Sequence, residues 1–163
     1  GGTQVISTIL HRATAYGLEK FAVDSLFSPL GIENYFWDKT LNGVPKAGWG
    51  LHLKMADMAK LGYLMLRNGI WKEKQLIPTY WVDKATTAQI KKDNTRDYGY
   101  QFWISREAAY QSYSFRGGYP PSHKIIEVIP ALAIVAVYVG ENVNFKEVIA
   151  THVKILEEEF TKH

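Results

Sequence analysis

The chain has 163 residues, which is enough for a single domain with its own hydrophobic core, and we expect one domain over residues 1–163. Hydrophobic residues make up 47% and charged residues 21%, and the net charge of +3 comes with scattered lysines, so the composition excludes long disorder and does not indicate a nucleic-acid partner. Because the chain has no cysteine, a disulfide scaffold, a thiolate metal site and a cysteine nucleophile are excluded, and no apolar run reaches the length of a membrane span.

Apolar residues recur with helical spacing in three segments of the first half of the chain. In the first segment, Val5, Ile6 and Ile9 fall on one stripe. The second segment is stopped by Pro29 and Gly31. The predicted elements of this half are helices over Thr3–Ala13, Leu18–Phe27 and Met55–Arg67, and a glycine-rich loop over residues 32–50 that contains Trp37 and Trp49.

β-Branched residues dominate two short runs in the second half, Ile125–Ile129 and Leu132–Val139, which are separated by Pro130. Such runs indicate neighbouring strands that are buried on both faces. The other predicted elements are a short helix starting at Pro78, a polar loop over Lys91–Asp97, an aromatic strand over Tyr98–Ile104, a strand ending at the turn Arg116–Gly118, and an amphipathic helix from Phe145 to the C-terminus. This order predicts an α+β fold with an antiparallel sheet of about three strands flanked by helices.

The predicted sheet has more apolar surface than the predicted helices can cover. Both faces of the pair Ile125–Ile129 and Leu132–Val139 are apolar, yet the C-terminal helix is the one helix that plainly packs on it. An uncovered apolar sheet with an open edge is a template for pairing with another chain. We therefore expect this chain to self-associate, with the strand Tyr98–Ile104 and the stripe of Val5, Ile6 and Ile9 at the contact.

Several segments together resemble the C-terminal half of the serine β-lactamase and penicillin-binding-protein-like family, in its class C and esterase-type branch. They are Ser28–Asn34 (Ser-Pro-Leu-Gly-Ile-Glu-Asn), Ala47–Leu51 (Ala-Gly-Trp-Gly-Leu) leading into Met55–Gly62 (Met-Ala-Asp-Met-Ala-Lys-Leu-Gly), and Tyr98–Ile104 (Tyr-Gly-Tyr-Gln-Phe-Trp-Ile). Phe115–Tyr119 (Phe-Arg-Gly-Gly-Tyr), followed by Val128–Pro130, is similar to the third family motif, with Arg116 where the family usually has Lys or His. The resemblance covers nearly all of the chain and implies a β-lactamase/transpeptidase-like fold whose sheet is incomplete here.

The resemblance implies acyl-enzyme chemistry by a serine hydrolase on β-lactam, D-amino-acid peptide or small ester substrates, without a cofactor. The family's nucleophile comes from a Ser-x-x-Lys motif, and a Tyr-x-Asn motif assists proton transfer. Neither motif occurs in this sequence, so we expect both to lie before residue 1 and the chain alone to be inactive. The family also implies a bacterial protein in the periplasm or another extracytoplasmic compartment.

The candidate substrate-binding residues are Arg116, Gly117, Gly118, Tyr119 and Trp49. Arg116 could bind a substrate carboxylate while the backbone near Gly118 polarises an acyl carbonyl, or the segment could be a tight turn with a solvent-facing arginine. Trp49 and Tyr119 could line the cleft or simply pack their loops. The histidines lack metal-ligand spacing, so no metal site is predicted.

An alternative function is a non-catalytic module on the same fold. Such a module would use Trp49, Tyr119 and Arg116 to hold a cell-wall peptide or glycan. The sequence of the parent gene upstream of Gly1 separates the two hypotheses, because a Ser-x-x-Lys motif there favours the enzyme.

Overall fold

The computed structural model describes residues 2–106, 110–117, 122–141 and 145–160. Its helices are α1 (Gly2–Ala13), α2 (Gly17–Ala22), the π-helical turn η1 (Val23–Phe27), α3 (Ser28–Leu30), α4 (Met55–Leu66), α5 (Thr79–Thr86), the 3-10 turn η2 (Pro130–Leu132) and α6 (Phe145–Phe160). Its strands are β1 (Tyr35–Trp37), β2 (Leu51–Leu53), β3 (Ile70–Trp71), β4 (Lys74–Gln75), β5 (Ile90–Lys91), β6 (Arg96–Tyr98), β7 (Trp103–Ser105), β8 (Ser112–Gly117), β9 (Ser122–Ile129) and β10 (Ile134–Glu141).

The main sheet has six antiparallel strands in the order β10-β9-β8-β7-β6-β5, so the prediction of about three strands is wrong. The predicted strand Tyr98–Ile104 is in fact the end of β6, a turn and the start of β7. Gly99 sits in that turn against α5, where a Cβ atom would lie 2.1 Å from the carbonyl oxygen of Ala85. The predicted loop Lys91–Asp97 likewise contributes to β5 and β6. These strands are too short for a sequence pattern to reveal.

The hairpin of β9 and β10 confirms the prediction of two neighbouring strands broken at Pro130. The strands pair over their full length, from Ile134 opposite Ile129 to Glu141 opposite Ser122. Pro130 begins the η2 turn that joins them. The hairpin is therefore set by local sequence.

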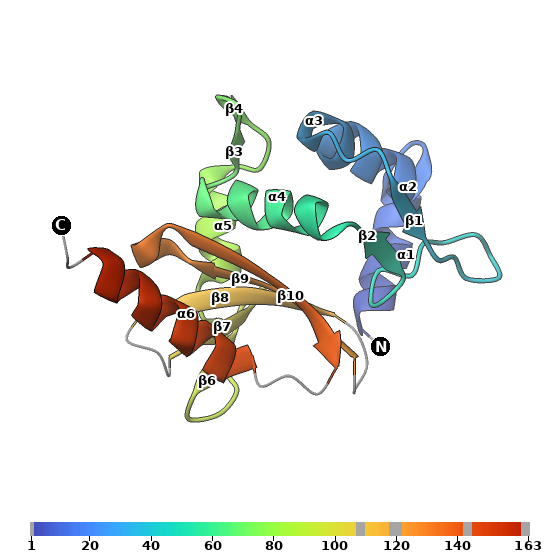
Figure 1. Cartoon of the computed structure of the whole chain (residues 1–163). Helices are drawn as coiled ribbons and strands as arrows, with labels where there is room; N and C mark the ends of the chain where they lie inside the picture. The colour runs from blue at the N-terminus through green and yellow to red at the C-terminus, as the bar shows by residue number, and fades with distance from the viewer. Residues whose placement is uncertain (1, 107–109, 118–121, 142–144, 161–163) are drawn as a thin grey trace.

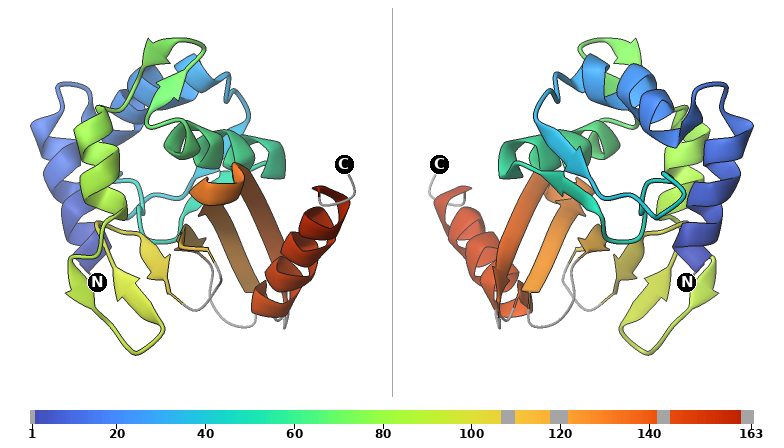
Figure 2. Two further views of the ribbon diagram at one scale, coloured as in Figure 1. Left: turned by 90° about the vertical axis from the view of Figure 1, so that its left-hand side faces the viewer. Right: turned by 90° about the vertical axis from the view of Figure 1, so that its right-hand side faces the viewer.

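Helix α4 packs on one face of this hairpin at very short range. A Cβ atom on Gly62 would lie 2.5 Å from Val135 Cγ1 and 2.7 Å from Ile126 Cγ2. Helix α6 lies on the opposite face, so the sheet stands between two helices (Figures 1 and 2). The expectation that the C-terminal helix alone covers the sheet is thus wrong, because the predicted helix Met55–Arg67 provides the second layer.

The N-terminal segment lies around the start of α4, with α3 above it and α1 at its side next to β2 (Figure 1). α2, η1 and α3 follow one another without a break and end at Gly31, which adopts a left-handed conformation with φ of 64°. Phe27, Leu30 and Ile32 bury their side chains against Leu64 of α4. Residues 32–50, predicted to be a loop, contain β1, which pairs with β2.

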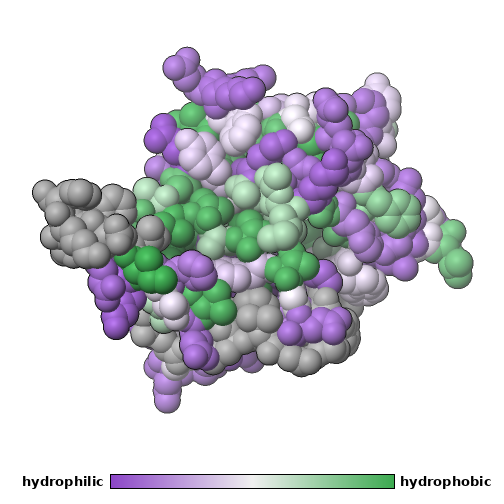
Figure 3. Space-filling view, in the orientation of Figure 1, coloured by the Kyte–Doolittle hydropathy of each residue, from purple (hydrophilic) through white to green (hydrophobic). Residues whose placement is uncertain are grey.

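Two apolar surfaces remain exposed. On α1, Val5 and Ile9 are 61% and 59% exposed, although the helix is anchored by Ser7 Oγ, which donates a 2.5 Å hydrogen bond to the carbonyl oxygen of Pro45. Apolar residues also gather over β10 between α4 and α6 (Figure 3). β10 is the last strand of the sheet order, and no described strand pairs with its outer edge.

Candidate substrate-binding rim on β8

Arg116 lies near the end of β8, between β7 and β9 in the sheet. Its backbone faces Ile125 of β9 in the antiparallel register, and Gly117 after it faces Lys124. Side chains alternate along a strand, so Arg116 shares a face with Ser114 and with Glu127, the cross-strand partner of Ser114. Ile126 and Val128 point instead toward Gly62 of α4. Arg116 therefore belongs to the face of the sheet opposite α4.

The guanidinium of Arg116 is held along its own strand. Arg116 Nε donates a hydrogen bond of 3.0 Å to Ser114 Oγ. The pKa of Arg116 is lowered from its ordinary value mainly because the surrounding protein removes water from it, while the carboxylate of Glu127 opposes this shift. Arginine remains a cation at neutral pH in any such environment. The end of β8 therefore presents a fixed positive charge.

Buried polar groups support Arg116 on this face. Glu127 is 4% exposed and Ser114 is 1% exposed. Ser112 Oγ donates a hydrogen bond to Glu127 Oε1, which satisfies one carboxylate oxygen of a group that would be costly to bury alone. Sequence reasoning missed these three residues. The signal was present, because Ser112, Ser114 and Arg116 alternate along one strand and Glu127 interrupts an apolar one.

The structure describes three of the five predicted site residues, Arg116, Gly117 and Trp49. Arg116 and Gly117 end β8, and a Cβ atom on Gly117 would meet no heavy atom of the described residues within 4 Å. Gly118 and Tyr119 lie outside the described residues. Trp49 is 57% exposed in the turn before β2. That turn lies on the same side of the molecule as the end of β8 (Figures 1 and 2), but within the described ranges Trp49 and Arg116 form no hydrogen bond or cation–π contact with each other.

The guanidinium at the end of β8 can bind and orient an anion, and the two serines that precede it on the strand are not exposed. Ser112 and Ser114, the serines nearest to Arg116 in sequence, are buried and already hydrogen-bonded to Glu127 and Arg116 respectively. Across the described ranges, no group of three or more His, Asp or Glu side chains could hold a metal ion. Within the same residues, no helix combines the length and apolarity that crossing a membrane requires.

No family model matches this sequence, and no curated protein matches it. Solved structures do match. The chain superposes with TM-score 0.69 and 19% identity on a Bacillus anthracis protein assigned as a 6-aminohexanoate-dimer hydrolase, covering 87% of this chain and 38% of that one. It superposes with TM-score 0.58 and 16% identity on a penicillin-binding protein from Bacillus halodurans, covering 83% and 49%.

A third match is the octameric penicillin-binding protein homologue from Pyrococcus abyssi, with TM-score 0.69, 18% identity, and coverage of 88% of this chain and 37% of that one. The chain thus spans less than half the length of each of these proteins. At such identities the likeness establishes the fold. This chain has part of the β-lactamase and penicillin-binding-protein-like fold.

Proposed function

We propose that this chain is the C-terminal part of a β-lactamase-like serine hydrolase and that Arg116 to Gly118 form one wall of its substrate cleft. The observation that carries the proposal is the fixed cation at the end of β8 on a fold shared with penicillin-binding proteins and with a protein assigned as a 6-aminohexanoate-dimer hydrolase. A cation at this position would bind the carboxylate of a β-lactam, of a D-amino-acid peptide or of a related small amide or ester.

The nucleophile and the base would come from another part of the protein. The sequence contains neither Ser-x-x-Lys nor Tyr-x-Asn, which in this kind of enzyme supply the attacking hydroxyl and assist proton transfer. The reaction would proceed through an acyl-enzyme, with backbone N–H groups near Gly118 stabilising the oxyanion. By the same resemblance, the protein would work outside the cytoplasm of a bacterium.

A non-catalytic binding module is the second candidate. It is favoured by the exposed indole of Trp49, which is available to stack on a sugar or peptide ligand at a rim that lacks a described nucleophile. Such a module would use Arg116 as an anchor for a ligand carboxylate and would need no Ser-x-x-Lys motif anywhere in the parent protein.

The deciding experiment is covalent labelling of the complete parent protein with a fluorescent penicillin and with a fluorophosphonate. A hydrolase will be labelled on a serine outside residues 1–163, and Arg116→Ala will slow labelling by the carboxylate-bearing penicillin more than labelling by the fluorophosphonate. Failure of both reagents to label a folded parent, together with glycan or peptide binding by that parent, would replace the enzyme with the binding module.

A further inference from the structure

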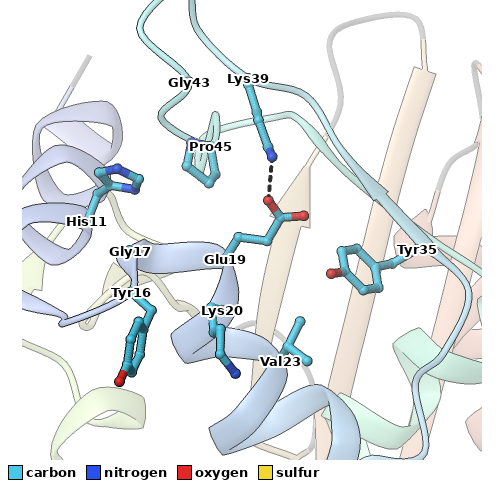
Figure 4. Close-up of a pocket in the computed structure, with 10 residues that line it drawn as sticks. All are labelled: His11, Tyr16, Gly17, Glu19, Lys20, Val23, Tyr35, Lys39, Gly43 and Pro45. Carbon is cyan, nitrogen blue, oxygen red and sulfur yellow. Dashed lines mark ion pairs between the residues drawn. The ribbon is translucent and has the colours of Figure 1, made fainter.

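A hollow lies on the N-terminal segment, away from the strand that carries Arg116. It has a volume of about 390 Å³, at the lower end of the range for small-molecule sites. Its walls come from α1, α2, η1, β1 and the loop after β1 (Figure 4). The lining residues are His11, Tyr16, Gly17, Glu19, Lys20, Val23, Tyr35, Lys39, Gly43 and Pro45.

An ion pair stands at the centre of this hollow. Lys39 Nζ lies 2.7 Å from Glu19 Oε2, and both side chains keep part of their surface exposed. The hydroxyl of Tyr35 points toward the pair from one side (Figure 4), and its pKa is raised by burial first and by the Glu19 carboxylate next. Tyr35 therefore remains a neutral hydroxyl that can donate or accept a hydrogen bond beside the two charges.

The other charged lining residue, Lys20, has its own partner. Its Nζ lies 2.8 Å from Asp24 Oδ2, one helical turn away. His11 forms the opposite wall and packs against Gly17, whose φ of 82° and missing side chain leave room for the imidazole ring. His11 Nδ1 accepts a hydrogen bond of 3.3 Å from the backbone N–H of Leu18, so in the neutral ring the proton is on Nε2. The hollow thus offers one carboxylate, one ammonium, a phenol hydroxyl and an imidazole ring.

A ligand that satisfies both charges of this pair must itself carry two opposite charges close together. The two atoms of the pair are 2.7 Å apart, so a ligand ammonium and a ligand carboxylate placed side by side would need a similar separation. An α-amino acid has this arrangement, because both groups are attached to one carbon atom. An ω-amino acid separates them by several bonds, and a simple carboxylate or amine satisfies one partner while competing with the other.

We propose that this hollow binds a free α-amino acid, with its ammonium on the Glu19 carboxylate and its carboxylate on Lys39 Nζ. Tyr35 and the Nε2–H of His11 supply further hydrogen bonds, and the half-buried apolar side chain of Val23 accommodates the ligand's side chain. The site does not depend on the proposed hydrolase activity, because none of its residues lies on the sheet that carries Arg116.

The test is an NMR titration of the ¹⁵N-labelled chain with alanine, with propionate and 4-aminobutyrate titrated in parallel. Alanine will shift the amide signals of Gly17 and Gly43 in a saturable way, and the other two compounds will bind at least about tenfold more weakly, the factor that corresponds to one lost charge-assisted contact. Alanine that causes no saturable shift, or propionate or 4-aminobutyrate that binds as tightly as alanine, would overturn the proposal.

Variants test the two charges separately. Glu19→Gln and Lys39→Met will each weaken alanine binding by about tenfold or more, while Lys91→Met, an exposed lysine on β5, will leave it unchanged. Unchanged affinity in either pocket variant contradicts the assignment. The comparison of the three compounds on the unmodified chain does not depend on the folding of any variant.

Discussion

Gly62 of α4 and Val135 of β10 lie so close together that a methyl group on Gly62 would stand 2.5 Å from Val135 Cγ1. Ile126 Cγ2 would stand 2.7 Å away on the other side. Both neighbours are β-branched, so neither side chain can easily turn aside. The helix can rest on the sheet at this depth because residue 62 is glycine.

Gly62→Ala should therefore destabilise the fold. Alanine is intrinsically favoured over glycine in a helix by roughly 1 kcal/mol. We nevertheless expect a net loss of about 1 to 3 kcal/mol, because the overpacked helix must move off the sheet. Urea unfolding followed by circular dichroism measures this. Gly48→Ala is the matched control, since its Cβ atom would have ordinary contact with Thr3 Cβ at 3.8 Å. Equal stability of the two variants would contradict the close packing.

The chain alone should show no catalysis above buffer with nitrocefin or p-nitrophenyl acetate. The physical reason is that it contains no Ser-x-x-Lys motif to activate a hydroxyl, and Ser112 and Ser114 near the rim are buried. Turnover that survives rigorous purification, accompanied by a covalent adduct on a serine found by mass spectrometry, would show that the chain has its own nucleophile.

Arg116→Ala in the complete parent protein should reduce kcat/KM for carboxylate-bearing substrates. The expected loss of transition-state stabilisation is about 1.5 to 3 kcal/mol, the range for a hydrogen bond to a charged group. Neutral esters should lose less, because they have no carboxylate for the guanidinium to bind. Arg67→Ala, an exposed arginine after α4, is the control. An equal loss on charged and neutral substrates would indicate that Arg116 serves only to hold Ser114 and the strand.

Self-association of the chain remains a prediction, but its expected place changes. Tyr98–Ile104 lies inside the sheet, whereas β10 has an outer edge without a described strand partner and an exposed Val139. Light scattering should detect dimers or larger species, with β10 and the stripe of Val5, Ile6 and Ile9 on α1 at the contact.

Val139→Lys should shift that equilibrium toward monomer, because a lysine on an edge strand opposes edge pairing. Leu41→Lys, at a fully exposed loop position, should not. A monodisperse wild-type monomer with a sharp cooperative melt would show that the chain closes its own core.

Asp93 should stabilise the turn before β6 in a pH-dependent way. Its carboxylate accepts hydrogen bonds from the backbone N–H and hydroxyl of Thr95 at 2.9 and 2.8 Å and also binds Arg96. These contacts lower the pKa of Asp93 below its ordinary 3.8, the Thr95 hydrogen bonds contributing most. The folded state therefore binds a proton on Asp93 less tightly than the unfolded state does. The stabilisation is present at pH values above the ordinary pKa of 3.8 and is lost as the pH falls from 3.8 toward the lowered pKa of the folded state.

Asp93→Asn should accordingly lower Tm at neutral pH, and the gap to wild type should close in acid. Asp24→Asn is the control, since Asp24 makes a single exposed pair with Lys20. Thermal melts at neutral pH and at pH values below 3.8 decide the matter. A difference in Tm that persists unchanged into acid would mean that the asparagine side chain destabilises the turn for steric reasons and not through the lost charge.

Sequence patterns predicted the elements whose boundaries are set locally. Helix α4 and the break at Pro130 between β9 and β10 were confirmed, because a helical stripe and a proline act over a few residues. The split of Tyr98–Ile104 into two strands could not be read in this way. In the folded protein Gly99 packs against the carbonyl oxygen of Ala85 in α5, and the N–H of Tyr100 donates a hydrogen bond to the same oxygen, which no pattern within Tyr98–Ile104 specifies.

At the candidate rim, too, some features could be predicted from nearby residues and others depend on the folded structure. The glycines after Arg116 predicted where β8 ends, and the structure agrees as far as Gly117. The support of Arg116 by Ser114 and Glu127 follows from the pairing register of β8 with β9, which a single sequence does not specify. The open position of Trp49 was equally beyond the sequence, because an aromatic residue in a loop is compatible with burial or exposure.

The order of the main sheet also has a consequence for how quickly the molecule forms. The strands from β5 to β10 pair only with strands that are next to them in the chain, so no pairing within this sheet joins strands that are distant in sequence. Domains dominated by contacts close in sequence fold faster than those that must close long loops first. The strands can therefore pair hairpin by hairpin, and we expect the docking of α4 to be the slower step, because Gly62 contacts Ile126 and Val135, which are distant from it in sequence.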